Sequence, residues 1–537
     1  MELLPRKATF APDEPLVLDA AGVVGRGEVR LLRLDEEVAL ARVRAGARRV
    51  ELPPQPEGGY GIELGLGSGA RWNGALDVLA DPLRRPRYGF VSRFDAGRDP
   101  GPVVEHARRF HLNVVQFYDW MYRHASLLPP RPRFRDALGR ELSLTTVRRL
   151  AAGLRAAGSA PLGYAAVYAV GRDELPRWEH ALLLDGAGKP WTLGKDFLWI
   201  VDPSDRDWSR QFGRELRAAL DVGFAGFHLD QYGAPQRALR RDGTEVDLAD
   251  AFPRLIRSVR RAVPDARLIF NNVNDFPTWT TARAPVDVVY VEVWPPHTTL
   301  AHLVDLVARA RALAPGKPVV LAAYLSCFGR APEREGVAAA QLLTATVASS
   351  GGFHLLHGEE GAVLIDPYYP NHHRLGASAV RALQPWQDFA VRYGDLLHDE
   401  RAVDVTRAVT GGINEELRVE APVPVATDPV AGSLWVRVVE TAEGRVVHLV
   451  DLSAQTTDGW DEPKTPLRRL AGVSLRVTSS SAALAQAHTP GLRSLKAERS
   501  GPYATFALPA IRGWAVVLLR GRLPERRPVR CAPPARV

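Results

Sequence analysis

The chain has 537 residues, with 69 Lys and Arg against 61 Asp and Glu and a formal net charge of +8. Hydrophobic residues make up 46% and charged residues 24%, a balance typical of a folded globular protein that excludes a disordered or collagen-like chain. No apolar run approaches the ~20 residues of a membrane helix, and acidic residues interrupt the arginines. We therefore expect neither a membrane nor a nucleic-acid partner.

The N-terminal part reads as short strands. Strand-like runs at 29–34, 38–43 and 61–66 are divided by Gly, Pro and Asp. This pattern predicts an immunoglobulin-like β-sandwich over residues 1–84. The segment 80–88 is expected to be an exposed linker, because proline interrupts strand ladders and arginine side chains prefer water.

A different pattern begins at Tyr88 and continues to about residue 400. Apolar runs alternate with amphipathic helical stretches, which is typical of a parallel sheet covered by helices. The runs lie at 88–95, 113–120, 160–170, 224–231, 267–274, 286–294, 318–326 and 351–358. Eight units predict a closed (β/α)8 TIM barrel over 85–400. The competing open sheet would need a Gly-rich GxGxxG turn after the first strand, and the sequence has none there.

The C-terminal part returns to strands. After a helical stretch at 378–397, strand-like runs lie at 433–441, 444–452, 472–479, 503–509 and 513–521. They predict a second antiparallel β-sandwich over 401–522, followed by a loose Arg- and Pro-rich tail at 523–537. The expected fold class is α/β, a TIM barrel flanked by N-terminal and C-terminal β-sandwiches.

No cofactor or metal is expected. Two cysteines are too few for a Cys-based cluster, and Cys327 reads as a small buried residue. His354 and His357 lie three apart on one expected strand and so on opposite faces, with at most one pointing into the barrel. Adjacent His372 and His373 are poorly placed to share one ion. The start MELLPRKATF lacks a signal-peptide pattern, so we expect a cytoplasmic protein of undetermined oligomeric state.

Two carboxylates end alternate strands of the expected barrel. Asp230 ends the fourth strand and Glu292 the sixth, and active sites of TIM barrels lie at this end of the strands. Side chains from alternate strands share a layer, so the pair can face each other. Glycosidases use such a pair as acid and nucleophile or base, with a gap of ~5–5.5 Å for retention and a wider gap for inversion. A structural salt bridge is the alternative, and the pattern leaves open which residue is the nucleophile.

Aromatic, amide and imidazole side chains surround these carboxylates. Aromatic faces stack on sugar rings, and polar groups bind sugar hydroxyls. The candidate substrate-binding residues are Tyr118, Asp119, Trp120, Tyr122, His124, His228, Gln231, Asn271, Asn272, Asn274, Trp279 and Trp294. The alternative for the group around Asp119 is packing against a loop, and Trp120 and Trp294 fit a core role equally well. Trp279 is the better stacking candidate because it falls in a loop.

The segments at the strand ends resemble glycoside hydrolase family 66, the dextranases and cycloisomaltooligosaccharide glucanotransferases. QFYDWMYRH, within 113–124, is the most specific stretch. The other matching stretches are YGFVSRFD (88–95), GFAGFHLDQYG (223–233), VVYVEVWPP (288–296), YYPNHHRL (368–375), VVHLVDL (446–452) and the region 460–466.

The resemblance implies retaining cleavage or rearrangement of α-1,6-glucan by a barrel between two sandwiches. It assigns Asp230 as the nucleophile and Glu292 as the general acid/base, and it adds a sugar contact from Asn371 or His372. The physical roles agree, since a general acid must hold a proton and we expect burial and the nearby anion to raise the pKa of Glu292.

The expected function is that of an endo-acting, dextranase-like hydrolase of dextran or isomaltooligosaccharides. The family's glucanotransferases carry an inserted carbohydrate-binding module between the seventh and eighth strands, and 327–350 leaves no room for one. A transglycosylase, cyclising or disproportionating, with the same catalytic pair is the first alternative. A non-catalytic glycan-binding protein is the second, and the presence of both Asp230 and Glu292 argues against it.

Overall fold

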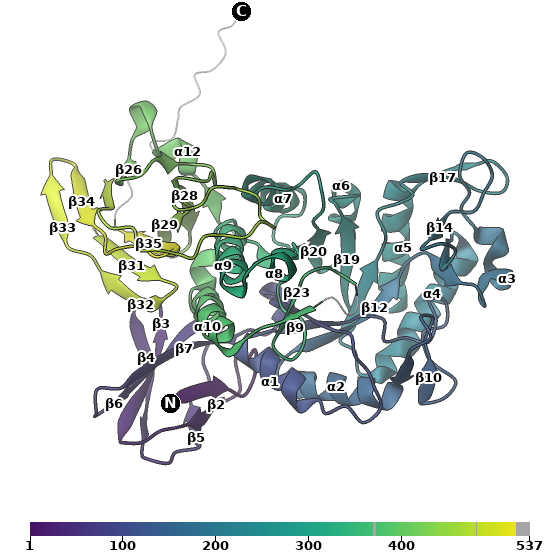
Figure 1. Cartoon of the computed structure of the whole chain (residues 1–537), viewed down its shortest axis with the longest axis horizontal. Helices are drawn as coiled ribbons and strands as arrows, with labels where there is room; N and C mark the ends of the chain where they lie inside the picture. The colour runs from purple at the N-terminus through teal and green to yellow at the C-terminus, as the bar shows by residue number, and fades with distance from the viewer. Residues whose placement is uncertain (369–371, 479–480, 522–537) are drawn as a thin grey trace, which may run out of the picture.

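A parallel eight-stranded barrel forms the centre of the molecule, and two β-sandwiches lie on one side of it (Figure 1). The computed structural model describes residues 1–368, 372–478 and 481–521. The barrel order is β8-β9-β12-β16-β19-β20-β21-β22, and a parallel bridge between Gly89 and His357 joins its two ends. The predicted fold class is therefore confirmed.

The barrel strands fall within the eight predicted apolar runs. Their bounds are β8 Tyr88–Val91, β9 Val114–Phe117, β12 Ala160–Ala166, β16 Gly226–Asp230, β19 Arg267–Val273, β20 Val288–Glu292, β21 Val319–Ala322 and β22 Phe353–His354. Their side chains alternate between two environments. Phe227 and Leu229 of β16 belong to the core shared with the outer helices, whereas Tyr290 of β20 and Ile269 of β19 belong to the barrel interior. This alternation decides which side chains reach the barrel mouth.

Amphipathic helices cover the outside of the barrel. In α5, for example, Phe252, Ile256 and Val259 are buried at spacings of four and three. The main helices are α1 Gly101–Arg109, α2 Leu144–Ala156, α4 Arg206–Ala219, α5 Leu248–Ala262, α7 Leu300–Leu313, α9 Glu333–Ser349 and α10 Ala377–Arg392.

Short elements inserted after the strands surround the mouth of the barrel. Antiparallel pairs form after β9, β12, β16 and β22. They are β10 Arg133–Arg135 with β11 Glu141–Ser143, β13 Ala169–Gly171 and β14 Thr192–Leu193 with β15 Leu198–Ile200, β17 Arg237–Leu239 with β18 Glu245–Asp247, and β23 Ala362–Leu364 with β24 His372–Arg374. Short helices after the strands are α3 Leu175–Trp178, α6 Thr278–Thr281 and α8 Cys327–Arg330, whereas α11 Gly394–Leu397 follows α10 at the other end of the barrel.

The N-terminal strands form two sheets around a separate apolar core. One sheet has the order β1-β2-β5 and the other β4-β3-β6-β7. Leu16, Leu18, Val29 and Ile62 are buried between them. The bounds are β1 Glu2–Pro5, β2 Leu16–Ala21, β3 Gly27–Arg33, β4 Glu36–Val43, β5 Arg49–Leu52, β6 Gly58–Leu66 and β7 Arg71–Val78.

The C-terminal strands also form two sheets. The larger contains β25 Val403–Asp404, β27 Val425–Ala426, β28 Leu434–Thr441, β29 Gly444–Asp451, β35 Trp514–Arg520, β31 Ser481–Gln486 and β32 Thr489–Ser494. The smaller contains β26 Leu417–Glu420, β30 Ser474–Val477, β34 Tyr503–Ala507 and β33 Ala497–Ser500, and α12 Thr406–Val409 lies between β25 and β26 in the chain. The hairpin of β31 and β32 was not predicted, because its two short strands, SAALAQ and TPGLRS, lack a run of branched or aromatic residues.

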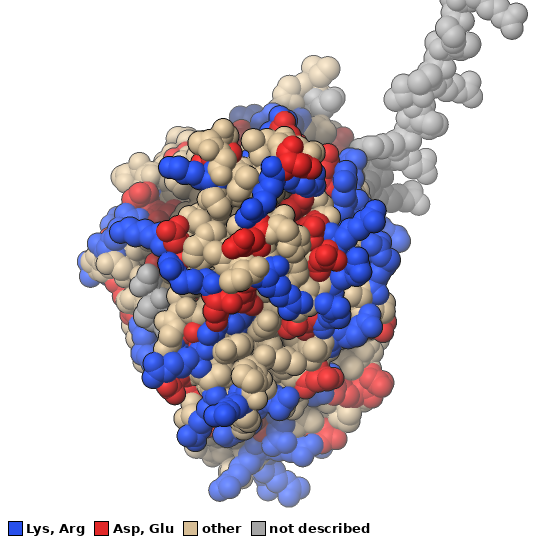
Figure 2. Space-filling view, turned by 90° about the vertical axis from the view of Figure 1, so that its right-hand side faces the viewer, with Lys and Arg blue, Asp and Glu red and all other residues tan. Residues whose placement is uncertain are grey.

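Charged residues of both signs are interspersed on the face at the right of Figure 1, as Figure 2 shows. Some form exposed ion pairs, such as Arg237 with Glu245 on β17 and β18. Pairs of this kind each contribute less than about 1 kcal/mol to stability. Among the described residues, no helix combines the length and apolar character needed to cross a bilayer.

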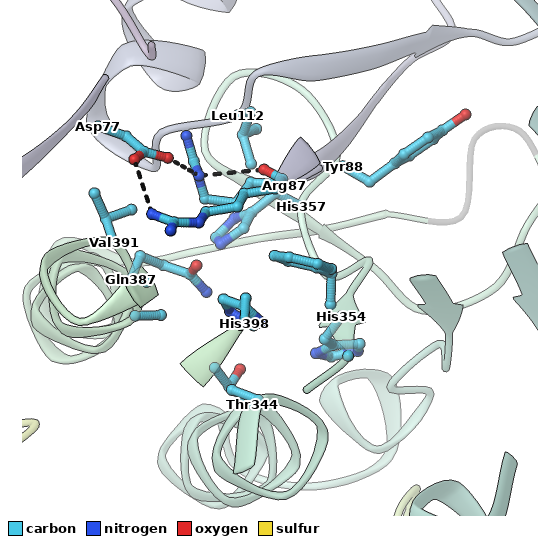
Figure 3. Close-up of a pocket in the computed structure, with 16 residues that line it drawn as sticks. Asp77, Arg87, Tyr88, Leu112, Thr344, His354, His357, Gln387, Val391 and His398 are labelled. Atoms are coloured by element: carbon cyan, nitrogen blue, oxygen red, sulfur yellow. Dashed lines mark hydrogen bonds and ion pairs between the residues drawn. The ribbon is translucent and has the colours of Figure 1, made fainter. Parts of the chain in front are cut away.

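The segment 80–88 corrects the prediction of an exposed linker. Pro82–Arg84 forms the short helix η1. Arg87 is buried, and its guanidinium lies 2.6 Å from Asp77 of β7 (Figure 3). It also donates to the carbonyl oxygen of His111. Arg85 pairs with Asp395 from the end of the barrel region. The ion pairs and hydrogen bonds of these arginines hold the N-terminal sandwich against the base of the barrel.

A small cavity of about 40 Å³ lies beside this junction, at the end of the barrel opposite its mouth. His354 and His357 both line it (Figure 3). β22 ends at His354, so the two-residue alternation behind the prediction of opposite faces does not extend to His357.

Candidate active site

A cavity of about 530 Å³ opens at the C-terminal ends of the barrel strands. Its floor comes from strand residues such as His228, Asp230 and Glu292, and part of its wall comes from Leu193 and Phe197 at the β14–β15 turn. The side chains that line it carry carboxylate, amide, imidazole and aromatic groups, which together can bind both faces of a sugar ring.

One amide joins the two predicted catalytic carboxylates. The Asn271 Nδ2 atom donates to Asp230 Oδ1 and to Glu292 Oε2, both at 2.7 Å. Each hydrogen of the amide therefore serves one carboxylate. The two accepting oxygens cannot be farther apart than twice 2.7 Å. Asn271 is thus a positioning residue that holds Asp230 and Glu292 at a fixed separation.

Asp230 has a second fixed partner, because the Tyr164 hydroxyl of β12 donates to its Oδ2 atom at 2.8 Å. Burial raises the pKa of Asp230 above its usual range, while the hydrogen bonds from Asn271, Tyr164 and the backbone of Gln231 oppose that rise. These donors favour the ionised carboxylate and fix the direction of its oxygens.

Glu292 is only 8% exposed. Burial and the charge of Asp230 raise its pKa, and hydrogen bonds from Asn271, Trp294 and Tyr324 limit the rise. The direction and both causes match the sequence-based expectation for a proton donor. Because the two carboxyl groups interact, the first proton lost on raising the pH leaves a charge that holds the second in place.

Asp119 lies at the edge of the same cavity. It takes a left-handed backbone conformation, φ 50°, which Asp tolerates better than most residues. Burial raises its pKa to about 7, and Arg140, 3.6 Å away, opposes that shift. The carboxyl group of Asp119 therefore borders the cavity with a pKa close to neutral.

His228 lies below Asp230 on the same inward face of β16. Its Nδ1 atom is 2.8 Å from the hydroxyl of Tyr88, and burial lowers its pKa to about 3. The imidazole is therefore neutral at neutral pH, and its pairing with Tyr88 ties the cavity floor to the interior of the barrel.

Seven of the fourteen predicted substrate-binding residues line the cavity. They are Tyr118, Asp119, His124, His228, Gln231, Asn271 and Trp294. Gln231 also hydrogen-bonds to the backbone of Asn271, Phe276 and Gly233. These bonds brace the turn after β16.

Trp120 and Tyr122 are predicted binding residues that the structure places elsewhere. Trp120 is fully buried, and its Nε1 atom donates to the Tyr164 carbonyl oxygen, so it is a core residue rather than a stacking platform. Tyr122 lines a small neighbouring cavity, and the guanidinium of Arg123 lies 4.1 Å from its ring centre.

Asn272 and Asn274 also need correction, because neither lines the cavity. Asn272 follows Asn271 on β19 and so points to the opposite face, where it donates to the Tyr290 carbonyl oxygen. Asn274 donates to the Pro295 carbonyl oxygen at 2.9 Å. Both hold backbone near the site.

The remaining predicted contacts lie outside the cavity lining or outside the described residues. Trp279 on α6 is 43% exposed beside Phe276, and His372 on β24 packs its ring against Phe90. Neither side chain lines the cavity. Asn371 lies outside the described residues.

The sequence analysis missed several side chains of the cavity, namely Gln116, Tyr164, Tyr290 and Tyr324. The alternation of side chains between the two faces of a strand could have identified these residues. Tyr290 precedes Glu292 by two residues on β20, and the two therefore share a face. The parallel pairing of Tyr164 with His228 likewise places Tyr164 next to an inward residue of β16.

Within residues 1–368, 372–478 and 481–521, no group of three or more His, Cys, Asp or Glu side chains is placed to hold a metal ion. The site contains two buried carboxyl groups that share one amide, with hydroxyl, amide and imidazole groups around them. This arrangement can carry out general acid catalysis and nucleophilic attack at one carbon.

Solved structures of carbohydrate-active enzymes share the fold. A cycloisomaltooligosaccharide glucanotransferase of Paenibacillus sp., in complex with cycloisomaltoheptaose, superposes with a TM-score of 0.86 at 18% identity, covering 96% of this chain and 99% of that one. A maltogenic α-amylase of Thermotoga neapolitana gives a TM-score of 0.54 at 10% identity, covering 82% and 100%. At these identities the likeness shows the fold alone.

Curated relatives are similar over part of the sequence. One cycloisomaltooligosaccharide glucanotransferase of Niallia circulans is 29% identical over 304 residues, which is 50% of this chain and 31% of that protein. A second from the same organism is 25% identical over 324 residues, or 55% and 33%. The aligned part of the chain thus spans about a third of the length of each of these relatives.

The family comparison covers far more of the chain. The sequence model of glycosyl hydrolase family 66 matches residues 28–517, which include the whole barrel, both catalytic candidates and most of each sandwich. The chain belongs to glycosyl hydrolase family 66.

Proposed function

We propose that this protein is a retaining enzyme acting on α-1,6-glucosidic links, through a covalent intermediate on Asp230. The bridge that Asn271 makes between Asp230 and Glu292 is the observation that carries the proposal. Oxygens no farther apart than twice 2.7 Å fit the ~5–5.5 Å spacing of retaining glycosidases better than the ~6.5–9.5 Å of inverting ones.

In the first step, Asp230 attacks the anomeric carbon while Glu292 gives its proton to the departing glycosidic oxygen. In the second step, Glu292 takes a proton from the incoming hydroxyl, which attacks the same carbon and releases Asp230. The raised pKa of Glu292 suits the proton transfer, and the donors on Asp230 suit a carboxylate that must be ionised before it attacks.

The incoming hydroxyl defines two candidate outcomes. Water gives hydrolysis, which the short segment 327–350 between the last two barrel strands favours through the resemblance. A sugar hydroxyl gives transfer or cyclisation, which the names of the Niallia circulans relatives favour. Family membership and the catalytic pair support both outcomes equally, and both use the same residues in the same first step.

The test is incubation with dextran and with linear isomaltooligosaccharides, with products separated by chromatography over time. Shorter linear products support hydrolysis, while cyclic products or products longer than the substrate support transfer. Proton NMR of the first product gives the stereochemistry. The proposal requires the α-anomer, and an initial β-anomer or the absence of turnover on both substrates would contradict it.

A further inference from the structure

A loop of the C-terminal sandwich reaches the catalytic end of the barrel. Residues 457–464 lie between β29 and β30, and they contact the loops that follow β20 and β21. The first of these loops follows Glu292 at the end of β20. The second follows Tyr324, which lies just after the end of β21. The contact therefore joins a distant part of the sequence to the neighbourhood of the proposed general acid.

Trp460 fixes the loop after β20. Its backbone nitrogen donates to the Thr298 carbonyl oxygen at 3.0 Å, and its indole Nε1 donates to the His297 carbonyl oxygen at 2.6 Å. Leu300, at the start of α7, donates to the Asp458 carbonyl oxygen at 2.9 Å. These bonds hold the backbone from 297 to 300 in one place.

Asp461 fixes the loop after β21. Its carboxylate accepts from the backbone nitrogen of Cys327 at 3.1 Å and from the hydroxyl of Ser326. Arg330 donates to its carbonyl oxygen at 2.8 Å. Ser326 follows Tyr324 by two residues, so this contact holds the chain just beyond a side chain of the cavity.

The loop itself is rigidly braced. Lys464 is 2% exposed, and its ammonium donates to the Thr457 and Gly459 carbonyl oxygens, both at 2.7 Å. At the base of the loop, Gln455 and Thr465 exchange two hydrogen bonds, at 2.9 and 3.1 Å. Burying an ammonium group costs free energy unless the group is hydrogen-bonded, so the bonds of Lys464 stabilise a single conformation of the loop.

We propose that the 457–464 loop positions the general acid, because it holds in place the two barrel loops whose side chains flank Glu292. The proposal rests on the proposed function for the role of Glu292. Trp294 and Tyr324 line the same cavity as Glu292, and each belongs to a segment that the loop fixes a few residues further on. Misplacing such a group by about 1 Å can cost roughly 100-fold in rate. Trp460 and Asp461 are therefore positioning residues, not catalytic ones.

The test compares Trp460→Phe with Trp435→Phe. Trp435 is a matched control, since it is buried in the same sandwich and its Nε1 atom also donates to a backbone oxygen, that of Thr427 at 3.0 Å. We expect Trp460→Phe to lower kcat on isomaltooligosaccharides about tenfold. It should leave kcat on an aryl glycoside with a good leaving group within about twofold, because that group needs little protonation. Trp435→Phe should change neither.

A second readout does not depend on turnover. Amide hydrogen exchange of residues 294–300 should speed up in Trp460→Phe and stay unchanged in Trp435→Phe. Unchanged exchange there, or equal losses on both substrates, would overturn the positioning role. If the wild type cleaves no α-1,6 link but exchange responds as expected, the proposed function fails while the structural link stands. Asp461→Asn tests the same role at the second barrel loop, should Trp460→Phe fail to fold.

Discussion

At the scale of single residues, the site depends on two carboxylates that share one amide. Replacing Asp230 by Ala removes the nucleophile, and we expect turnover of every substrate to fall by roughly 10⁴-fold or more. Glu292→Gln keeps the shape but not the proton. It should lose about 10²–10⁴-fold on glucans and far less on aryl glycosides with good leaving groups. Steady-state kinetics on both substrate classes checks this. Near-wild-type activity of Asp230→Ala would remove that residue from the mechanism.

The same carboxylates predict a bell-shaped dependence of kcat/KM on pH. Asp230 must be ionised and Glu292 protonated, so activity is lost below the apparent pKa of the first and above that of the second. Both are raised by burial, and the higher belongs to Glu292. The optimum should therefore lie above the usual range of carboxylates. A kcat/KM profile with no basic limb below pH 9 would contradict Glu292 as the acid.

Tyr164 provides a finer test at this scale. Its hydroxyl stabilises ionised Asp230, so Tyr164→Phe should raise the pKa of Asp230 and move the acidic limb of the profile to higher pH. Losing a hydrogen bond to a charged group should also cost about tenfold in kcat/KM. Tyr168→Phe is the matched control, because the Tyr168 hydroxyl donates to the Ala234 carbonyl oxygen instead. An equal shift in both variants would rule out the specific contact.

Residue types were read correctly more often than side-chain directions. Asp230, Glu292 and Asn271 could be predicted because a strand end in a barrel points its last inward residues at the mouth. Trp120 and Asn272 were misjudged because each lies next to an inward residue, and a shift of one position turns a side chain toward the helices or the backbone.

At the scale of elements, the segment between β7 and β8 shows how a junction is stabilised. Asp77 is fully buried against Arg87, so Asp77→Asn leaves a buried guanidinium without its counter-charge. We expect a loss of roughly 3–5 kcal/mol in the free energy of unfolding, measured by denaturant titration. Glu141→Gln breaks the exposed pair with Arg135 and should cost less than about 1 kcal/mol. Equal effects would mean that the buried pair contributes no more than a surface pair.

The strands and main helices of the barrel were largely predictable, because apolar runs and helical periodicity are local properties of the sequence. The junctions were not. An Arg- and Pro-rich stretch such as 80–88 has the composition of a linker, and only the position of Asp77 and His111 shows that Arg87 is buried there.

At the scale of the whole molecule, the barrel and the C-terminal sandwich share one core. Trp514 of β35 packs against Phe389 and Trp386 of α10, with ring centres 4.9 and 6.1 Å apart. We therefore expect these two parts to unfold in one transition, and Trp514→Ala to lower stability by roughly 3–5 kcal/mol. Scanning calorimetry checks both. Two separate transitions, with Trp514→Ala changing only one of them, would contradict a shared core.

The sequence by itself determined the order sandwich, barrel, sandwich and the two carboxylates at the strand ends, because residue periodicity and strand ends are set locally. Tertiary structure alone decided that Asn271 bridges those carboxylates, that Tyr164 orients one of them, and that residues 457–464 fix loops more than a hundred residues away in the chain. Such contacts depend on the three-dimensional packing of separate elements, which no local pattern specifies.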